Sequence, residues 1–262
     1  MQLARHIENG QLLYLSKNND DKNLEAISIS ENEHYRWITF EDVIQSVMHK
    51  RKPSQLTLPH QSAMLLPLLF FKPSNIVELG LGGGNFARYL TQLTPNISFT
   101  TIECNPIVIA CFEKYFNPQA STINIIENRA EHWLTDETLH HKITKNLDWL
   151  ICDVYQQQLS DFSETIKLLE IFINTLSNNT CLSINLPDSS DQDVNLCLTV
   201  LQQIQKHHRI VYFHVPNYLN VIIHLVPVHW PIDFPLKKNT QSYLPKRTYK
   251  HGLRFWQHLK EI

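Results

Sequence analysis

A glycine-rich turn, Gly80-Leu81-Gly82-Gly83-Gly84, limits what this chain can fold into more than any other feature. It holds four of the six glycines in a chain of 262 residues. An apolar run at Ile76-Val77 precedes the turn, and a segment of helical periodicity begins at Phe86. Glycines at such a turn let the backbone approach a ligand closely, and the amides at the helix start favour polar or anionic groups. The pattern predicts a Rossmann-like nucleotide-binding unit, and by itself it fits NAD, a flavin or S-adenosylmethionine.

From residue 75 onward, short apolar runs alternate with longer segments of helical period. We expect strands at 75–79, 98–102, 122–126, 147–152, 180–185, 210–214 and 220–226. We expect helices at 84–93, 106–116, 130–136, 162–176 and 192–206. Repeated β-α-β order predicts an α/β fold with a mostly parallel sheet and helices on both faces. The last two strands have only a Pro216-Asn217 turn between them, so we expect the last strand to be antiparallel.

The two ends of the chain differ from this central pattern. Alternating runs at 12–16 and 26–30, an aromatic and β-branched run at 35–40, and a turn cluster at 18–21 predict a small antiparallel meander. After residue 230 the chain is irregular and proline-containing, and it ends in an amphipathic stretch at 248–259. We therefore expect an N-terminal β-strand region at 1–52, a Rossmann-like nucleoside-binding domain at 53–230, and a C-terminal tail with a short helix at 231–262.

The composition argues against several classes of binding partner. The net charge of −2 supplies no overall field for nucleic acid or a membrane surface, so neither is an expected partner. No run approaches the roughly 20 apolar residues of a membrane span, and the start does not resemble a signal peptide, so we expect a cytoplasmic protein. The five cysteines form no C-x-x-C pair and are expected to be buried, reduced thiols. The 14 histidines show no metal-ligand spacing, so no metal site is expected.

Two acidic residues mark the expected ligand-binding edge of the sheet. Glu103 ends the second strand about 20 residues after the turn, where a carboxylate can accept hydrogen bonds from both ribose hydroxyls. Alternatively, Glu103 can be an acidic residue at the N-terminus of a helix, since Asn105-Pro106 resembles an N-cap and first-turn pair. Asp153 follows the fourth strand, which should neighbour the first at the switch point of the sheet. A carboxylate there can bind a cation, act as a general base, or cap a loop.

Several segments resemble the spermidine synthase (polyamine aminopropyltransferase) family, especially its bacterial spermidine synthase-like members. The most specific is QLTLPHQSAMLLPLLFFKPSNIVELGLGGGNFARYL at 55–90. TTIECNPIVIACFEKYF resembles the family's VEIDP…YF segment, WITFEDVIQSVMHKRKP its β-domain hairpin, and VPNYLNVIIHLVP its final strands. The resemblance runs from about residue 35 to residue 227. It implies a class I methyltransferase-like sheet with an N-terminal β-meander, and a homodimer, which is common in the family.

The resemblance also implies a reaction and roles within it. The reaction is transfer of an aminopropyl group from decarboxylated S-adenosylmethionine to a diamine or related small amine. In that reading Asp153 takes a proton from the attacking amine, and Glu103 holds the ribose. The remaining positions implied for the nucleoside and the sulfonium are Gly80, Gly82, Gly84, Gln45 and Gln61.

The chain departs from the family at four places. Asn85 stands where an aspartate binds the cofactor's amine, and His60 stands where the family has a tyrosine. Asp153 is followed by Val154, Tyr155 and Gln156, where the family has Asp-x-x-Asp. Arg129 stands in the segment that reads the adenine amino group, and arginine has no acceptor for that group. Two carboxylates have thus become neutral amides, and each charge-assisted contact to a cation is worth about 1.5–3 kcal/mol.

Three functions follow from these residues. The first is an aminopropyltransferase-like enzyme, with Asn85 and Arg129 beside the cofactor and with His60, Tyr155 and Gln156 beside the substrate. The second is a methyltransferase that uses intact S-adenosylmethionine, since two neutral amides suit a less cationic substrate. The third is a degenerate family member that binds a nucleoside or a partner protein without catalysis.

Overall fold

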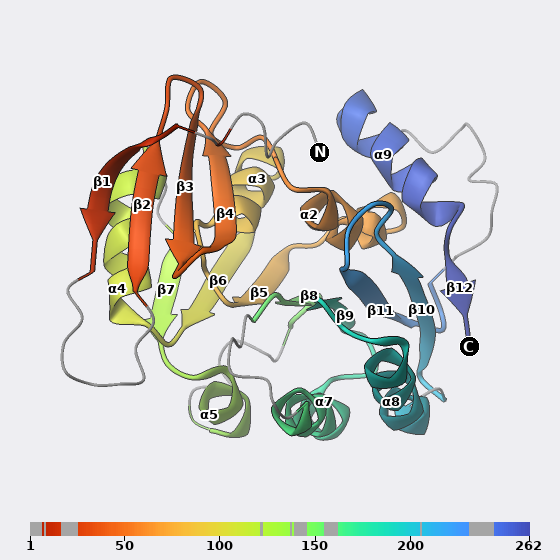
Figure 1. The fold of residues 1–262 in the computed structure, drawn as a ribbon. Coiled ribbons are helices and arrows are strands. Elements are labelled where there is room, and N and C mark those ends of the chain that lie inside the picture. Colours follow the sequence, from red (N-terminus) through yellow and green to blue (C-terminus); the bar gives the residue numbers. More distant parts are fainter. Residues whose placement is uncertain are drawn as a thin grey trace.

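The computed structural model describes residues 7, 9–16, 26–120, 123–136, 138, 146–154, 162–204, 206–230 and 244–262. Its elements form two sheets with helices between and around them (Figure 1). The turn cluster at 18–21 and the proline-containing stretch at 231–243 lie outside these residues.

The larger sheet has eight strands in the order β12-β10-β11-β9-β8-β5-β6-β7. These strands are β5 (Asn75–Leu79), β6 (Ser98–Glu103), β7 (Asn124–Glu127), β8 (Trp149–Cys152), β9 (Cys181–Leu186), β10 (His208–His214), β11 (Val221–Pro227) and β12 (Lys260–Glu261). Strands β5 to β9 pair in parallel, and β11 lies antiparallel between β9 and β10. The predicted α/β class and the antiparallel last strand are therefore confirmed. The chain runs outward from β5 through β6 and then from β8 through β9, so the switch point lies between β5 and β8.

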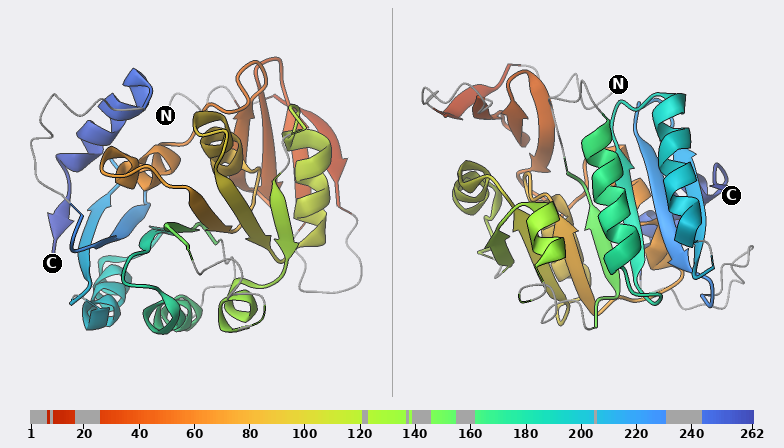
Figure 2. Two further views of the ribbon diagram at one scale, coloured as in Figure 1. Left: turned by 180° about the vertical axis from the view of Figure 1, so that it is seen from behind. Right: turned by 90° about the horizontal axis from the view of Figure 1, so that it is seen from below.

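Helices cover both faces of this sheet, as Figure 1 and Figure 2 show. Apolar side chains of one face pack against α5 (Ala130–Thr135), α7 (Ser163–Thr175) and α8 (Asp191–Leu201), which η3 (Gln202–Ile204) extends. The other face packs against α2 (Pro59–Met64), η1 (Leu66–Leu69), α3 (Asn85–Leu93) and α9 (Lys246–Trp256). All six residues of β9 are buried, as expected for a central strand covered on both faces.

The N-terminal sheet is antiparallel, in the order β1 (Gln11–Leu15), β2 (Ile27–Glu31), β3 (Tyr35–Phe40) and β4 (Val43–His49). Alternation and residue type predicted only the first three of these strands, whereas the family resemblance predicted the β3–β4 hairpin. The sheet packs through Ile27 and Met48 against α4 (Pro106–Cys111) and the π-helical turn η2 (Phe112–Phe116). The helix expected at 106–116 is thus α-helical only to Cys111.

The C-terminal stretch adds to the central sheet. The amphipathic segment forms α9, as predicted, and Gly252 brings that helix against the side chain of Leu69 in η1. The two residues of β12 then pair with β10, which the sequence did not indicate. Among the helices in the described ranges, none is long and apolar enough to span a bilayer.

Candidate active site

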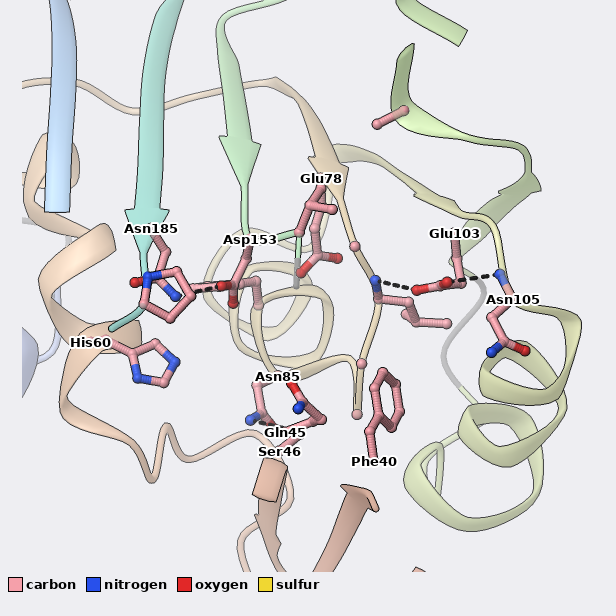
Figure 3. A pocket seen from close by; sticks show the side chains of 18 of the residues that line it. Phe40, Gln45, Ser46, His60, Glu78, Asn85, Glu103, Asn105, Asp153 and Asn185 are labelled. Atoms are coloured by element: carbon pink, nitrogen blue, oxygen red, sulfur yellow. Dashed lines mark hydrogen bonds between the residues drawn. The ribbon is translucent and has the colours of Figure 1, made fainter. Parts of the chain in front are cut away.

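A cavity of about 760 Å³ lies between the N-terminal sheet and the carboxyl ends of the central strands. Its walls come from β4, the start of α2, the glycine turn, and the segments that follow β6, β8 and β9. Figure 3 shows polar side chains from β4, α2, α3, β5, β6 and β9, and Asp153 after β8, around one space. The expected site residues that line it are Gln45, His60, Gln61, Gly80, Gly82, Asn85, Glu103, Arg129 and Asp153.

The glycine turn begins where the ends of β5, β6 and β8 lie side by side. The Gly80 N–H donates to the carbonyl of Ile102 at 2.9 Å, and the Asp153 N–H donates to the carbonyl of Leu79 at 3.0 Å. Gly80 has φ +91°, and a Cβ there would lie 2.5 Å from the carbonyl oxygen of Asp153. Only glycine permits both the backbone conformation and the close approach.

Gly84 has a packing role. It also has a positive φ, +66°, and it precedes α3 as the N-cap. A Cβ at this position would collide with the ring of Phe112. Gly84 is absent from the lining of the cavity, where Gly83 is found instead.

Glu103 joins the second strand to the glycine turn. Its Oε2 accepts from the Leu81 N–H at 3.0 Å, and its Oε1 accepts from the Asn105 N–H at 2.8 Å (Figure 3). The helix that follows is capped separately, by Asn105 Oδ1 accepting from the Ile107 N–H. A carboxylate has about four acceptor positions, so Glu103 keeps capacity for two hydroxyl donors from the cavity.

Asp153 lies at the centre of the cavity's polar wall. Its Oδ1 accepts from Asn185 Nδ2 at 2.8 Å, and His60 lies nearby on the same side of the cavity (Figure 3). Burial lowers the pKa of His60, and the charge of Asp153 opposes that effect only in part. The imidazole is therefore neutral at neutral pH and can both donate and accept a hydrogen bond.

Both ends of the Asn85 amide are engaged within the fold. Its Oδ1 accepts from the guanidinium of Arg88, and its Nδ2 donates to Ser46 Oγ at 2.8 Å. Arg88 is 1% exposed and also donates to the carbonyls of Gly83, Phe116 and Pro53. Asn85 therefore ties α3 to the N-terminal sheet as well as facing the cavity.

The two glutamines differ in how they are held. Gln61 Oε1 accepts from the Leu58 N–H at 3.2 Å, which fixes the amide at the start of α2. Gln45 Nε2 is buried and has no hydrogen-bond partner among the residues that the structure describes. A buried donor without a partner is costly, so a ligand acceptor would stabilise it.

Glu78 is a cavity residue that the sequence analysis did not single out. It is 1% exposed, and its Oε2 accepts from the Thr101 hydroxyl at 2.8 Å. Burial raises the pKa of Glu78 well above its ordinary value, and the charges of Asp153 and Glu103 raise it further. The signal was present in the sequence, because an acidic residue interrupts an apolar strand directly before the glycine turn.

The remaining expected residues are less enclosed. Arg129 lines the cavity, but its side chain is 59% exposed and its Nε lies 3.7 Å from Glu131 Oε2. Cys104 lines the cavity as well and is exposed, so the expectation that all five thiols are buried was wrong for this one. It directly follows the end of β6, where the chain leaves the core. Tyr155 and Gln156 lie outside the described residues.

Metal ligands do not gather in the part of the chain that the structure describes, where no group of three or more His, Cys, Asp or Glu side chains is placed to hold an ion.

Comparison with curated proteins finds similarity to polyamine aminopropyltransferases. A stretch of 93 residues is 38% identical to the enzyme of Neisseria meningitidis serogroup A, covering 34% of this chain and 35% of that protein. A stretch of 92 residues is 35% identical to the enzyme of Chromobacterium violaceum, with coverage of 34% and 35%. The chain thus matches about a third of the length of these relatives. No family model matches the chain. The resemblance seen in the sequence is confirmed over that stretch.

Solved structures show the same fold. A probable spermidine synthase from Corynebacterium glutamicum aligns with a TM-score of 0.63 and 16% identity, covering 82% of this chain and 79% of that one. A spermidine synthase in complex with the transition-state analogue AdoDATO aligns with a TM-score of 0.55, 14% identity and coverage of 82% and 72%. Human methyltransferase-like protein 13 in complex with SAH aligns at 0.53, with 15% identity and coverage of 77% and 93%. These likenesses confirm the predicted class I methyltransferase-like sheet with its small N-terminal sheet.

Proposed function

We propose that the cavity binds decarboxylated S-adenosylmethionine and that the chain transfers its aminopropyl group to a small amine. The observation that carries this proposal is the position of Asp153. Its carboxylate lies at the switch point, in the same cavity as the glycine turn and Glu103, in a chain similar to polyamine aminopropyltransferases. A base at that edge of the sheet can reach a nucleophile presented to a ligand bound on the turn.

The proposed reaction is a single displacement. The lone pair of the acceptor amine attacks the methylene carbon bound to sulfur, and a C–N bond forms as the C–S bond breaks. The electrons of the broken bond return to sulfur, which converts the sulfonium to the neutral thioether of methylthioadenosine. The attacking nitrogen gives up one proton, and Asp153 accepts it. The chain's main contribution is to hold the two reactants in line and close together.

The charge of the cavity supports a cationic ligand. The residues that line it include five carboxyl groups but one guanidinium, that of Arg129. The five carboxyl groups belong to Glu78, Glu103, Asp153, Glu164 and Asp188. Glu78 is well placed to compensate for the missing acid at Asn85, because it is buried beside the glycine turn and only Oε2 is hydrogen-bonded among the described residues. Ionising this carboxyl next to a bound ammonium would form a charge-assisted pair.

Methyl transfer from intact S-adenosylmethionine is the second candidate. The observation that favours it is Asn85, which is neutral and already held by Arg88 and Ser46. The carboxylate of the intact molecule would then face an amide at that position. It would still meet Glu78 and Asp153 nearby, which is why we rank this candidate below aminopropyl transfer.

Ligand binding separates these candidates. We expect decarboxylated S-adenosylmethionine and methylthioadenosine to raise the unfolding temperature, since a ligand at 100 times its Kd stabilises by about 2.7 kcal/mol. Intact S-adenosylmethionine should give a smaller shift. A shift with the intact form alone would favour methyl transfer, and no shift with any of the three would overturn the proposal of a nucleoside-binding transferase.

A further inference from the structure

Strands β8, β9 and β11 carry two successive rows of polar side chains on one face of the sheet. The lower row is buried. The Trp149 indole N–H donates to Ser183 Oγ at 2.9 Å, and Ser183 Oγ is hydrogen-bonded to His224 Nδ1 at 2.8 Å. Ser183 and His224 are 0% exposed. This row fixes the three strands relative to one another beneath the cavity.

The register of the strands places the upper row. Trp149 is opposite Cys181 and Ile151 is opposite Ser183, so the next pair on this face is Asp153 with Asn185. On the other side of β9, Ile222 is opposite Asn185. Asn220 precedes Ile222 by two positions and therefore points to the same face. The upper row thus contains Asp153, Asn185 and Asn220, all of which line the cavity.

Hydrogen bonds run along this row in one direction. Asn220 Nδ2 donates to Asn185 Oδ1 at 3.0 Å, and Asn185 Nδ2 donates to Asp153 Oδ1 at 2.8 Å. The opposite orientation of the Asn185 amide would bring its carbonyl oxygen against the carboxylate and lose the first bond. Asn220 therefore fixes which end of the amide Asp153 meets.

These two hydrogen bonds leave the two carboxylate oxygens of Asp153 in different environments. Oδ1 is held by Asn185, whereas Oδ2 has no hydrogen bond to any residue in the described part of the chain. The titratable groups facing Asp153 are His60 from α2, Glu78 from β5 and the adjacent Cys152. None of these three donates a hydrogen bond to it. Asn185 is thus the side chain that donates a hydrogen bond to the Asp153 carboxylate among the described residues.

We propose that Asn185, held by Asn220, is a positioning residue that stabilises the Asp153 carboxylate through its hydrogen bond to Oδ1 and leaves Oδ2 to receive the proton of the acceptor amine. This inference rests on the proposed function for the identity of the proton donor. The hydrogen-bonded arrangement itself can be tested with or without turnover.

The test compares Asn185→Ala with the wild type by two readouts. The first is the titration of the Asp153 carboxyl carbon by ¹³C NMR, assigned from the signal that Asp153→Asn loses. We expect this carbon to titrate at higher pH in Asn185→Ala, because the charged form has lost its donor. The second is the pH dependence of methylthioadenosine release. We expect kcat to fall roughly 10- to 100-fold, with its acid limb moved to higher pH and the KM for the sulfonium substrate little changed.

Two further variants serve as controls for Asn185→Ala. Asn195→Ala, on the exposed face of α8, should match the wild type in both readouts. Asn185→Asp keeps the shape and removes the donor, so it should move the Asp153 titration in the same direction as Asn185→Ala. An unchanged titration in both Asn185 variants would overturn the inference. A wild type that releases no methylthioadenosine with any amine would instead overturn the proposed function, and the NMR titration would still decide the role of Asn185.

Discussion

Gly80 shows how closely the fold and the site depend on each other at the scale of one residue. A Cβ at Gly80 would lie 2.5 Å from the Asp153 carbonyl, whereas one at Gly82 would meet nothing closer than 3.9 Å. Both residues have positive φ, so both substitutions carry the strain of a left-handed backbone, about 1–2 kcal/mol. We expect Gly82→Ala to cost about that much and Gly80→Ala to cost more, because the clash is with backbone. Urea unfolding measures the difference, and equal costs would contradict the account.

Glu103 provides the second prediction at this scale. Glu103→Gln keeps one acceptor oxygen but loses the charge and half of the acceptor capacity that the ribose needs. Since hydrogen bonds to charged groups are worth about 1.5–3 kcal/mol, we expect the Kd for methylthioadenosine to rise roughly 10-fold or more. Titration calorimetry measures this Kd. Glu113→Gln, on the exposed side of η2, is the matched control and should bind like the wild type.

Sequence reasoning found part of this site and missed part. Glu103 and Asp153 were predictable because each directly follows an apolar strand, and such ends converge at one edge of a parallel sheet. Asn185 lies inside β9, and Asn220 directly precedes the antiparallel strand β11, so the same rule does not identify them. Both are uncharged amides, which are common in loops. Glu78 lies inside a strand, so its burial depends on what covers the sheet.

At the scale of elements, Arg88 of α3 connects its own helix and the glycine turn to two segments that are distant in the sequence. Its buried guanidinium donates to the carbonyls of Pro53, Gly83 and Phe116, and to Asn85 Oδ1. Burial lowers its pKa to about 9, so it stays charged at neutral pH. We expect Arg88→Met to destabilise by about 3 kcal/mol or more, because several buried carbonyls lose their donor.

The control for Arg88→Met is Arg51→Met. The Arg51 side chain is 75% exposed, and its one ion pair among the described residues is a long one, 3.7 Å to Glu33. That change should stay within about 0.5 kcal/mol. Denaturant unfolding of the two variants tests the contrast, and a mild effect of Arg88→Met would mean that these connections contribute little.

Elements were predictable where one physical signal dominated. The strands and helices from β5 to β11 follow buried apolar runs and helical periodicity, and the structure places them within a few residues of expectation. Strand β4 begins with exposed Val43 and Ile44 and carries Gln45-Ser46, so its alternation is weak. Helix α2 and strand β12 are too short for periodicity to identify, and they depend on contacts with distant segments.

At the scale of the whole molecule, stability should depend on pH through two buried groups of opposite kind. Burial lowers the pKa of His224 to about 3, so the unfolded chain binds more protons between about pH 3 and the ordinary histidine range. Stability should therefore fall as the pH drops through that window. Burial raises the pKa of Glu78, so the folded chain binds more protons above the ordinary glutamate range, and stability should fall as the pH rises there.

The Glu78→Gln variant isolates the second effect. The amide keeps the shape and an acceptor for Thr101 but cannot ionise. We expect its unfolding temperature, relative to the wild type, to increase as the pH is raised from 5 to 8. Scanning calorimetry at several pH values measures this. A difference that stays constant with pH would show that Glu78 titrates in the folded chain as it does in the unfolded one.

Turnover tests the central claim most directly. The purified chain would be incubated with decarboxylated S-adenosylmethionine and a panel of diamines and monoamines, and both products would be measured by mass spectrometry. The account predicts equal amounts of methylthioadenosine and an aminopropylated amine, with release lost in Asp153→Asn and retained in Asn195→Ala. Absence of both products across the panel, or undiminished release by Asp153→Asn, would contradict it.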